Sequence, residues 1–365
     1  MVEYLTLFFV LLFASVAFYL AYDRYFRKEA KSDSALYVEA LRDLLDGRPE
    51  SAFGKLRQVV ISDADNIDAY MRLGQILREH KKPDRALQVH KDLTLRQDLG
   101  AEKKVAILRH LALDYADLGE RDTAEAALRE LISLHPDSHW AFSQLLRLQR
   151  DAGNWSEAYD TAAKLLKLEN SKSKKPLAYF KYRMGMQLFE KLEYHKARVL
   201  FKEAIGLNPE FSPAYVAIGD SYCEEKRFED AVNFWKKLID AVPGEGHQVL
   251  DRLERTLFDL GRFGDIADIC ESILSASPKD IPARLMLAEF HKKKGDLERA
   301  EEILLQVVED NPDDIGPIIE LIRIYVEQDD RKRLAAFVRQ LGQKQEKKNG
   351  KPLGGIVDGS LIGIN

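Results

Sequence analysis

Residues 212–244 read SPAYVAIGDSYCEEKRFEDAVNFWKKLIDAVPG. Apolar residues recur in this stretch at intervals of three and four, which predicts two amphipathic helices joined by a short turn. Gly219 and Ala231 are small at the places where two such helices would cross closely, and larger side chains there would push the helices apart. Pro243 cannot continue a helix, so it sets the end of the second one. The stretch therefore predicts one helix–turn–helix unit.

The same pattern returns about every 34 residues along the chain. Its first small position falls at Ala40, Gly74, Ala112, Leu146, Gly185, Gly219, Glu254, Ala288 and Ile322. This period is that of tetratricopeptide repeats, whereas HEAT and armadillo units are about 40–47 residues long. We therefore predict an all-α fold, a right-handed superhelical solenoid of about nine tetratricopeptide-like repeats over residues 34–345. Polar inserts near residues 96–103 and 170–175 stretch two of the intervals and predict longer turns.

An apolar run lies near the start of the sequence. Tyr4–Tyr22 carries no charged residue, and four basic residues follow it before position 32. As a helix the run would be about 28 Å long, close to the hydrocarbon thickness of a bilayer. We expect residues 1–23 to be a transmembrane anchor and residues 24–33 a basic juxtamembrane segment, with the repeats on the cytoplasmic side. A cleaved signal peptide is the alternative, but it would need basic residues before the run.

Composition and the last residues limit the classes of partner. The chain of 365 residues has 55 Lys and Arg and 60 Asp and Glu, a formal net charge of −5, which argues against nucleic acid as the main partner. Residues 346–365 are polar and then glycine-rich, without a helical period, so we expect a flexible C-terminal tail. Cys223 and Cys270 stand in apolar settings and are predicted to be buried, reduced thiols.

No pattern in the sequence indicates catalysis. His135 and His139 are four residues apart, but Pro136 between them prevents a helical metal pair. The glycine pairs lack the spacing and the lysine of a phosphate-binding loop. The sequence also contains no CxxC pair. We therefore predict a protein that is not an enzyme and that has no cofactor and no metal.

Helical register predicts where a partner would bind. In such a superhelix the first helix of each repeat lines the concave side, and one stripe of positions faces inward. In repeats two to five this stripe is rich in arginine and aromatic residues, which carry most of the energy in interfaces. The predicted partner-binding groove consists of Arg78, Arg109, Trp140, Arg147, Arg150, Tyr179, Tyr182, Met186 and Phe189. The alternative is that Tyr182 and Phe189 only pack between repeats and that the arginines are solvated.

Two stretches carry a resemblance to a known family. AYMRLGQILREHKKPDRALQVHKDL (residues 69–93) and VAILRHLALDYADLGERDTAEAALREL (residues 105–131), together with one anchor and about nine repeats, resemble the lipopolysaccharide assembly protein B family. The resemblance implies a non-catalytic inner-membrane adaptor with cytoplasmic repeats. Such an adaptor brings the deacetylase of the lipid A pathway to a membrane AAA+ protease and can gather other lipopolysaccharide-assembly proteins.

The sequence departs from that family in one respect and leaves other functions open. The family usually ends in a rubredoxin-like metal knuckle with two CxxC pairs, and no such pair is found here. One alternative function is a general scaffold for the assembly of a membrane machine, such as a pilus or a secretion system. Another is a periplasmic chaperone, which requires the reversed topology. Self-association of the chain is also left open.

Overall fold

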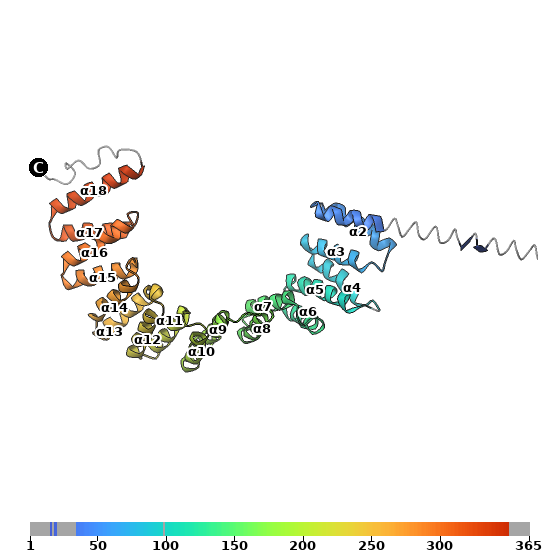
Figure 1. Ribbon diagram of the computed structural model, residues 1–365, viewed down its shortest axis with the longest axis horizontal. Coiled ribbons are helices and arrows are strands. Elements are labelled where there is room, and N and C mark those ends of the chain that lie inside the picture. Colours follow the sequence, from blue (N-terminus) through green and yellow to red (C-terminus); the bar gives the residue numbers. More distant parts are fainter. Residues whose placement is uncertain (1–14, 17, 20–33, 98, 350–365) are drawn as a thin grey trace, which may run out of the picture. The chain divides into compact units, whose positions relative to one another are not determined.

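The computed structural model describes residues 15–16, 18–19, 34–97 and 99–349 (Figure 1). Within these ranges the regular elements are helices and there is no β-strand, which confirms the all-α class. Most of the expected transmembrane segment Tyr4–Tyr22 and all of residues 24–33 lie outside them. Among the described residues, no helix combines the length and the apolar character that crossing a bilayer requires.

The chain forms two compact units, one ending at Lys172 and one beginning at Ser173. In the first unit the helices are residues 34–45, α2 (Pro49–Ser62), α3 (Ile67–Glu79), α4 (Pro83–Thr94), α5 (Ala101–Asp117), α6 (Arg121–Leu134), α7 (His139–Asp151) and α8 (Trp155–Leu168). The boundary between the units falls in the polar insert near residues 170–175. The handedness of the superhelix stays a prediction.

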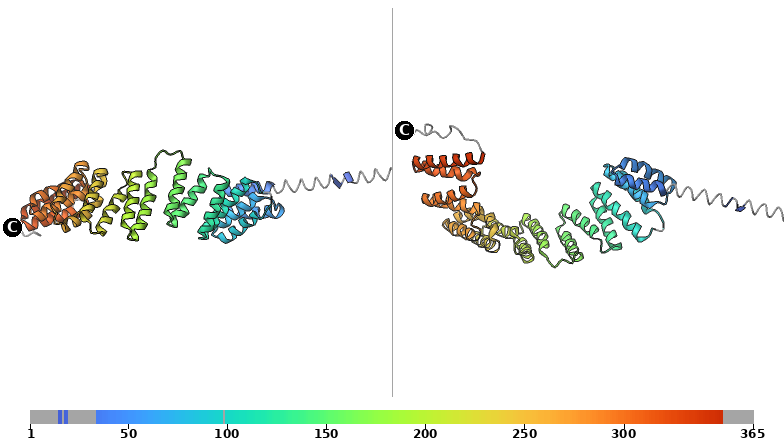
Figure 2. Two further views of the ribbon diagram at one scale, coloured as in Figure 1. Left: turned by 90° about the horizontal axis from the view of Figure 1, so that it is seen from below. Right: turned by 45° about the horizontal axis from the view of Figure 1, so that its top comes forward.

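The second unit continues the same alternation of helices. It contains the short 3-10 helices η1 (Lys175–Leu177) and η2 (Pro243–Val249). Its α-helices are α9 (Ala178–Glu190), α10 (Tyr194–Leu207), α11 (Ser212–Glu224), α12 (Phe228–Ala241), α13 (Leu250–Asp259), α14 (Asp265–Ala276), α15 (Ile281–Lys294), α16 (Leu297–Asp310), α17 (Ile315–Glu327) and α18 (Arg331–Asn349). In both units consecutive helices run side by side (Figure 2).

The ends of the helices follow from local sequence. Helices α10, α12 and α14 each end two residues before a proline, namely Pro209, Pro243 and Pro278. Short polar side chains begin other helices: Asn66 Oδ1 accepts a hydrogen bond from the Ala69 amide at 3.1 Å. The prolines end the helices, and the capping side chain satisfies a backbone amide that has no partner within the helix.

The last helix is longer than the sequence pattern predicted. We expected a flexible tail over residues 346–365, but α18 continues through Asn349. Glutamine, glutamate and lysine are good helix formers, so the polar run after residue 345 can prolong the helix. The rest of the expected tail, residues 350–365, lies outside the described residues.

The glycines of the repeat pattern make room for a large side chain on the second helix of the same repeat. A Cβ atom on Gly219 would lie 2.1 Å from Nε1 of Trp235, and one on Gly185 would lie 2.5 Å from the ring of Phe201. Both rings are almost completely buried. The close approach predicted at these positions is therefore between a helix backbone and an aromatic ring.

Candidate functional site

One hollow in the second unit contains three of the predicted groove residues. Tyr182, Met186 and Phe189 of α9 line a cavity of about 420 Å³. The remaining lining residues come from α11, η2 and α13, and they are Pro213, Val216, Ala217, Asp220, Gln248 and Arg252. The first helices of three successive repeats thus contribute to one surface. This arrangement is what the register of the inward-facing stripe requires.

The aromatic wall of this cavity is held by ring packing behind it. The Tyr182 ring lies 5.7 Å from the Phe201 ring and 5.6 Å from the Phe211 ring, measured between centroids. Phe189 meets Tyr194 edge-on at 5.2 Å. Tyr182 and Phe189 are both half-buried, so they pack on one side and line the cavity on the other. Burial also raises the pKa of Tyr182, which keeps its hydroxyl neutral.

The opposite wall is polar. Arg252 Nε donates to Asp220 Oδ1 at 2.8 Å, and both side chains remain partly exposed. Burial raises the pKa of Asp220, while the bond from Arg252 lowers it. A hollow with an aromatic and aliphatic wall facing an ion pair suits a peptide that buries an apolar side chain and keeps its backbone near polar groups.

Tyr179, the fourth predicted residue of α9, does not line this cavity. Its ring lies edge-on to that of its neighbour Phe180, with 5.6 Å between the centroids. It lies one turn before Tyr182, toward the start of the helix. The structure therefore brings together three of the four predicted residues of this helix.

The predicted residues of the first unit form a separate, basic surface. The Arg109 guanidinium carbon lies 4.4 Å from the centroid of the Trp140 ring, which joins α5 to α7 by a cation–π contact. Arg147 donates to Gln144 Oε1 from Nε at 3.3 Å and from Nη2 at 3.1 Å. Arg109, Arg147 and Arg150 are exposed. This exposure is compatible both with a partner-binding groove and with the alternative of solvated arginines.

Arg78 is largely buried, unlike the other predicted arginines. Its Nη1 pairs with Asp114 Oδ1 at 2.8 Å, and only 12% of its side chain is exposed. Asp114 is fully buried and also bonds to Nδ1 of His90. His90 Nε2 faces the carbonyl oxygen of Met71 at 3.2 Å. The two ring nitrogens of His90 thus face the Asp114 carboxylate and a backbone carbonyl. Arg78 therefore compensates a buried charge between repeats two and three.

A second histidine lies beside this buried pair. His110 stacks on His90 with 4.7 Å between the ring centroids. Its pKa is lowered to about 3, first by burial and then by the positive charges of His90, Arg78, Arg109 and Arg72. The neutral state of His110 is thus a consequence first of its burial and then of positively charged groups on α3, α4 and α5. An acidic segment would be attracted to the exposed part of this surface.

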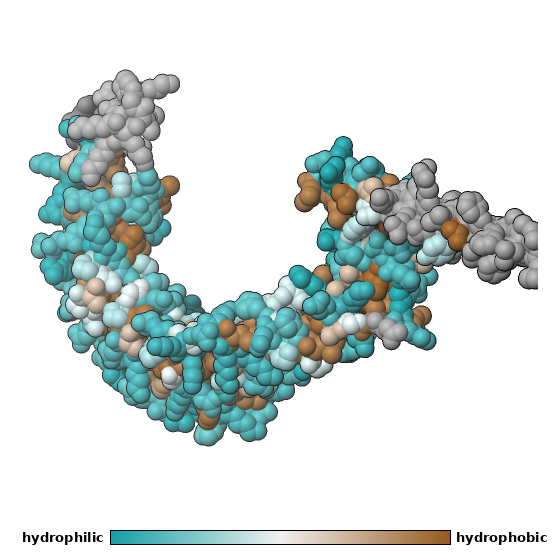
Figure 3. All heavy atoms as spheres, turned by 45° about the vertical axis from the view of Figure 1, so that its right-hand side comes forward, coloured by the Kyte–Doolittle hydropathy of each residue, from teal (hydrophilic) through white to brown (hydrophobic). Residues whose placement is uncertain are grey.

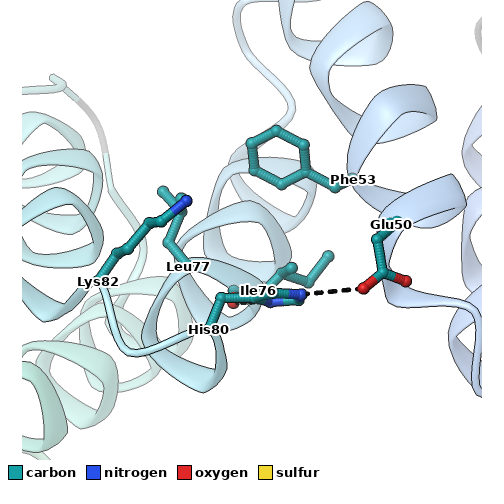
Figure 4. A pocket seen from close by; sticks show the side chains of 6 residues that line it. All are labelled: Glu50, Phe53, Ile76, Leu77, His80 and Lys82. Atoms are coloured by element: carbon teal, nitrogen blue, oxygen red, sulfur yellow. Dashed lines mark hydrogen bonds and ion pairs between the residues drawn. The ribbon is translucent and has the colours of Figure 1, made fainter.

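A pocket that the sequence pattern did not predict lies between α2 and α3. Its volume is about 180 Å³, and its lining residues are Glu50, Phe53, Ile76, Leu77, His80 and Lys82 (Figure 4). His80 Nδ1 contacts the Ile76 carbonyl at 2.8 Å, and Nε2 contacts Glu50 Oε1 at 3.3 Å. These two acceptors raise the pKa of His80 above its ordinary value. His80 follows the end of α3, outside the stripe, so helical register could not reveal it.

The described part of the chain offers no obvious reactive centre. No group of three or more His, Cys, Asp and Glu residues within it is arranged to hold a metal ion. Burial raises the pKa of the Cys270 thiol to about 12, which keeps it protonated and unreactive. Hydrophobic residues on the face drawn in Figure 3 form separate patches in a largely hydrophilic surface. These features fit a protein that binds partners through grooves.

Comparison with known proteins supports this interpretation. Tetratricopeptide repeat models match residues 108–138 and 257–322. Lipopolysaccharide assembly protein B of Escherichia coli (strain K12) is 22% identical over 284 residues, which cover 78% of this chain and 73% of that protein. The protein of the same name from Haemophilus influenzae is 23% identical over 271 residues, covering 69% and 68% of the two chains.

A solved tetratricopeptide repeat protein from Parabacteroides merdae is 15% identical and covers 81% of this chain and 99% of its own, with a TM-score of 0.37. Tetratricopeptide arrays present extended surfaces for binding. The resemblance predicted from the sequence is confirmed: the chain is a non-catalytic tetratricopeptide-repeat protein that is similar to lipopolysaccharide assembly protein B.

Proposed function

We propose that this protein is an adaptor for lipopolysaccharide assembly that holds protein partners on the first helices of its repeats. The observation that carries the proposal is the cavity of about 420 Å³ in which Tyr182, Met186 and Phe189 face the Asp220–Arg252 ion pair. The similarity to lipopolysaccharide assembly protein B over 78% of the chain supports the choice of pathway.

The more specific form of the proposal concerns regulated proteolysis. The adaptor presents the deacetylase of the lipid A pathway to a membrane AAA+ protease. It works at the cytoplasmic face of the bacterial inner membrane, with Tyr4–Tyr22 as its anchor. The support is the family resemblance, together with a repeat surface that has room for a segment of another chain.

The chemistry of the cavity sets what such a segment must contain. One leucine-sized or phenylalanine-sized side chain buried against Met186 and the two rings contributes about 1.5–3 kcal/mol. The Asp220–Arg252 pair can exchange hydrogen bonds with the backbone or the polar side chains beside that anchor. In the first unit, Arg109 and Arg147 favour a partner that carries carboxylates. The two surfaces belong to different units, and each can be tested alone.

Replacement of Met186 by glutamate tests the proposal. A carboxylate in the apolar wall must be desolvated when a partner binds, so Met186→Glu should lose at least tenfold of the affinity for the captured partner. Gln187→Glu adds the same charge at the next residue of α9, which does not line the cavity. The readout is photo-crosslinking in cells from a probe residue placed at position 213, with mass spectrometry of the captured proteins and immunoblotting of the deacetylase.

The expected result is that Met186→Glu loses the captured proteins and changes the abundance of the deacetylase, while Gln187→Glu behaves as the wild type. An unchanged set of captured proteins in the Met186→Glu strain, at normal expression, would refute the groove. Capture dominated by pilus or secretion components, with constant deacetylase abundance, would refute the assignment to lipopolysaccharide assembly.

A further inference from the structure

The second unit contains another hollow, formed mainly by the second helices of two repeats. It lies between α10 and α12, with one residue from α11, and its volume is about 540 Å³. Its floor is apolar and consists of Ile205, Tyr215 and Phe234. None of its lining residues lines the cavity of α9, α11 and α13. In Figure 1, α10 and α12 lie on one side of this unit and α9 and α11 on the other.

Two lysines stand at the rim of this hollow. Lys202 of α10 and Lys237 of α12 are both exposed, and neither makes an ion pair with a carboxylate in the part of the chain that the structure describes. Lys237 Nζ instead lies 4.7 Å from the centroid of the Phe234 ring. By contrast, Lys181 of α9 is paired with Glu203 at 2.8 Å. The hollow thus combines an apolar floor, of which Ile205 and Phe234 are partly exposed, with two cations that have no carboxylate partner among the described residues.

The charged residues of the hollow are arranged asymmetrically. Lys202 and Lys237 are almost one repeat apart in sequence, so they lie at equivalent levels on successive second helices. Asp240 comes one turn after Lys237 on α12 and also lines the hollow. A negative group is therefore favoured between the two lysines and disfavoured near the end of α12.

We propose that this hollow is a second docking surface, whose occupant is an acidic amphipathic peptide segment. An apolar side chain of the segment rests on Phe234 and Ile205, and a carboxylate one turn away lies between Lys202 and Lys237. A lipid surface fits less well, because only two lysines stand beside the apolar floor. Stable electrostatic attachment to a membrane takes a larger basic cluster.

Because this docking surface lies on the second helices, it allows the same repeats to bind a second partner. Because this hollow and the cavity of α9, α11 and α13 share no lining residue, one polypeptide can occupy the first helices while another occupies the second helices. Two partners can then be held by the same pair of repeats at the same time. Only this last consequence rests on the proposed adaptor function; the docking surface itself does not.

The test uses the full chain in detergent micelles and fluorescence anisotropy of labelled peptides. The probe is a twelve-residue peptide with phenylalanine and leucine at positions i and i+4 and glutamates beside them; its control has lysines in place of the glutamates. We expect Lys202→Glu with Lys237→Glu to weaken binding of the acidic peptide about tenfold or more, and Asp240→Lys to strengthen it.

Lys294→Glu with Lys332→Glu is the matched control, because it makes the same change of net charge at exposed positions of α15 and α18, away from both hollows. This variant should bind as the wild type does. Met186→Glu should also keep the acidic peptide, which separates failure of this surface from failure of the groove. Equal binding of the two peptides, wild-type affinity in the Lys202 and Lys237 double variant, or binding to anionic vesicles without binding to the peptide would overturn the proposal.

Discussion

Replacing Gly219 by alanine tests the packing that holds the second unit together. The added Cβ would lie 2.1 Å from Nε1 and 2.4 Å from Cδ1 of Trp235, where ordinary contact begins at 3.4 Å. The indole must therefore move by about 1 Å in a close-packed core. Its Nε1–H also donates to the Val216 carbonyl at 3.3 Å, and the movement breaks this bond.

The magnitude follows from three contributions to the free energy of unfolding. Forcing extra volume into a packed core costs about 1–3 kcal/mol. Loss of the indole hydrogen bond costs about 1 kcal/mol. The higher helix propensity of alanine stabilises the helix by about 1 kcal/mol and offsets part of this loss. We expect Gly219→Ala to destabilise the second unit by about 1–3 kcal/mol, whereas Gly54→Ala in α2, where nothing lies within 4 Å, should stabilise the first unit by about 0.5–1 kcal/mol.

The assay is native-state hydrogen exchange followed by mass spectrometry. It resolves α11 and α12 from the rest of the chain, which matters because a repeat array need not unfold in one step. Trp235→Leu provides a double-mutant cycle: once leucine replaces the ring, adding alanine at position 219 should cost about 1 kcal/mol less. Faster exchange confined to α11, α12 and their neighbours is expected. If Gly219→Ala slowed exchange, as Gly54→Ala is expected to do, this prediction would be refuted, because Trp235 would then not limit the size of the side chain at position 219.

The remaining predictions concern charged side chains in the first unit. Asp114→Asn leaves the Arg78 cation without its buried carboxylate, so hydrogen exchange in α3–α5 should report a loss of about 3–5 kcal/mol, and a loss below about 1 kcal/mol would refute the buried pair. Asp117→Asn is its control, because this exposed carboxylate lies 3.9 Å from Arg78 and should contribute less than about 0.5 kcal/mol. The folded-state pKa of His80 is raised above 6.5, so its contacts stabilise the fold below that pH and are lost as the pH rises through the folded value. An NMR titration midpoint at or below 6.5, or pH-dependent stability that persists in His80→Gln, would contradict this.

Much of the fold could be predicted because its signals are local. The spacing of small residues and the prolines at positions 209, 243 and 278 act within one repeat, and the helices end where these prolines require. What each glycine contacts could not be predicted in this way. The ring that fills the space above Gly219 comes from 16 residues further along the chain, and only the crossing of the two helices brings it there.

In the candidate site, too, the contacts within one helix could be predicted from the sequence, and the contacts between repeats could not. Tyr182, Met186 and Phe189 belong to one face of one helix, so the register prediction that they share a surface agrees with the cavity that they line. Arg78 lies on the corresponding face of its own helix, yet its guanidinium turns to Asp114, which belongs to the next repeat. A stripe counted along single helices contains no information about such a partner. Charged positions are therefore less predictable than apolar ones in this chain.

The fourth repeat departs from the pattern by exchanging the sizes of two residues that are 16 positions apart. The three repeats with alanine at the first small position carry leucine 16 residues later, and the fourth repeat has the reverse order, with Leu146 and Ala162. Since the combined volume is nearly conserved, a bulky residue at the first position need not separate the helices. In the seventh repeat, Glu254 at this position pairs with Lys293 of the next repeat at 3.1 Å.

The two largest fully buried aromatic side chains pack against glycines in the repeats where binding is proposed. Gly185 with Phe201 and Gly219 with Trp235 lie in the two successive repeats whose helices α9–α12 supply most of the residues of both hollows. A glycine backbone packed against an aromatic ring fixes the distance between the first and second helix of a repeat more tightly than two flexible aliphatic chains would. Rigid helices keep a surface preorganised, which lowers the entropy that a partner loses on binding. These two repeats, which pack a glycine against a large aromatic ring, are therefore well suited to hold a partner on each of their two helix layers.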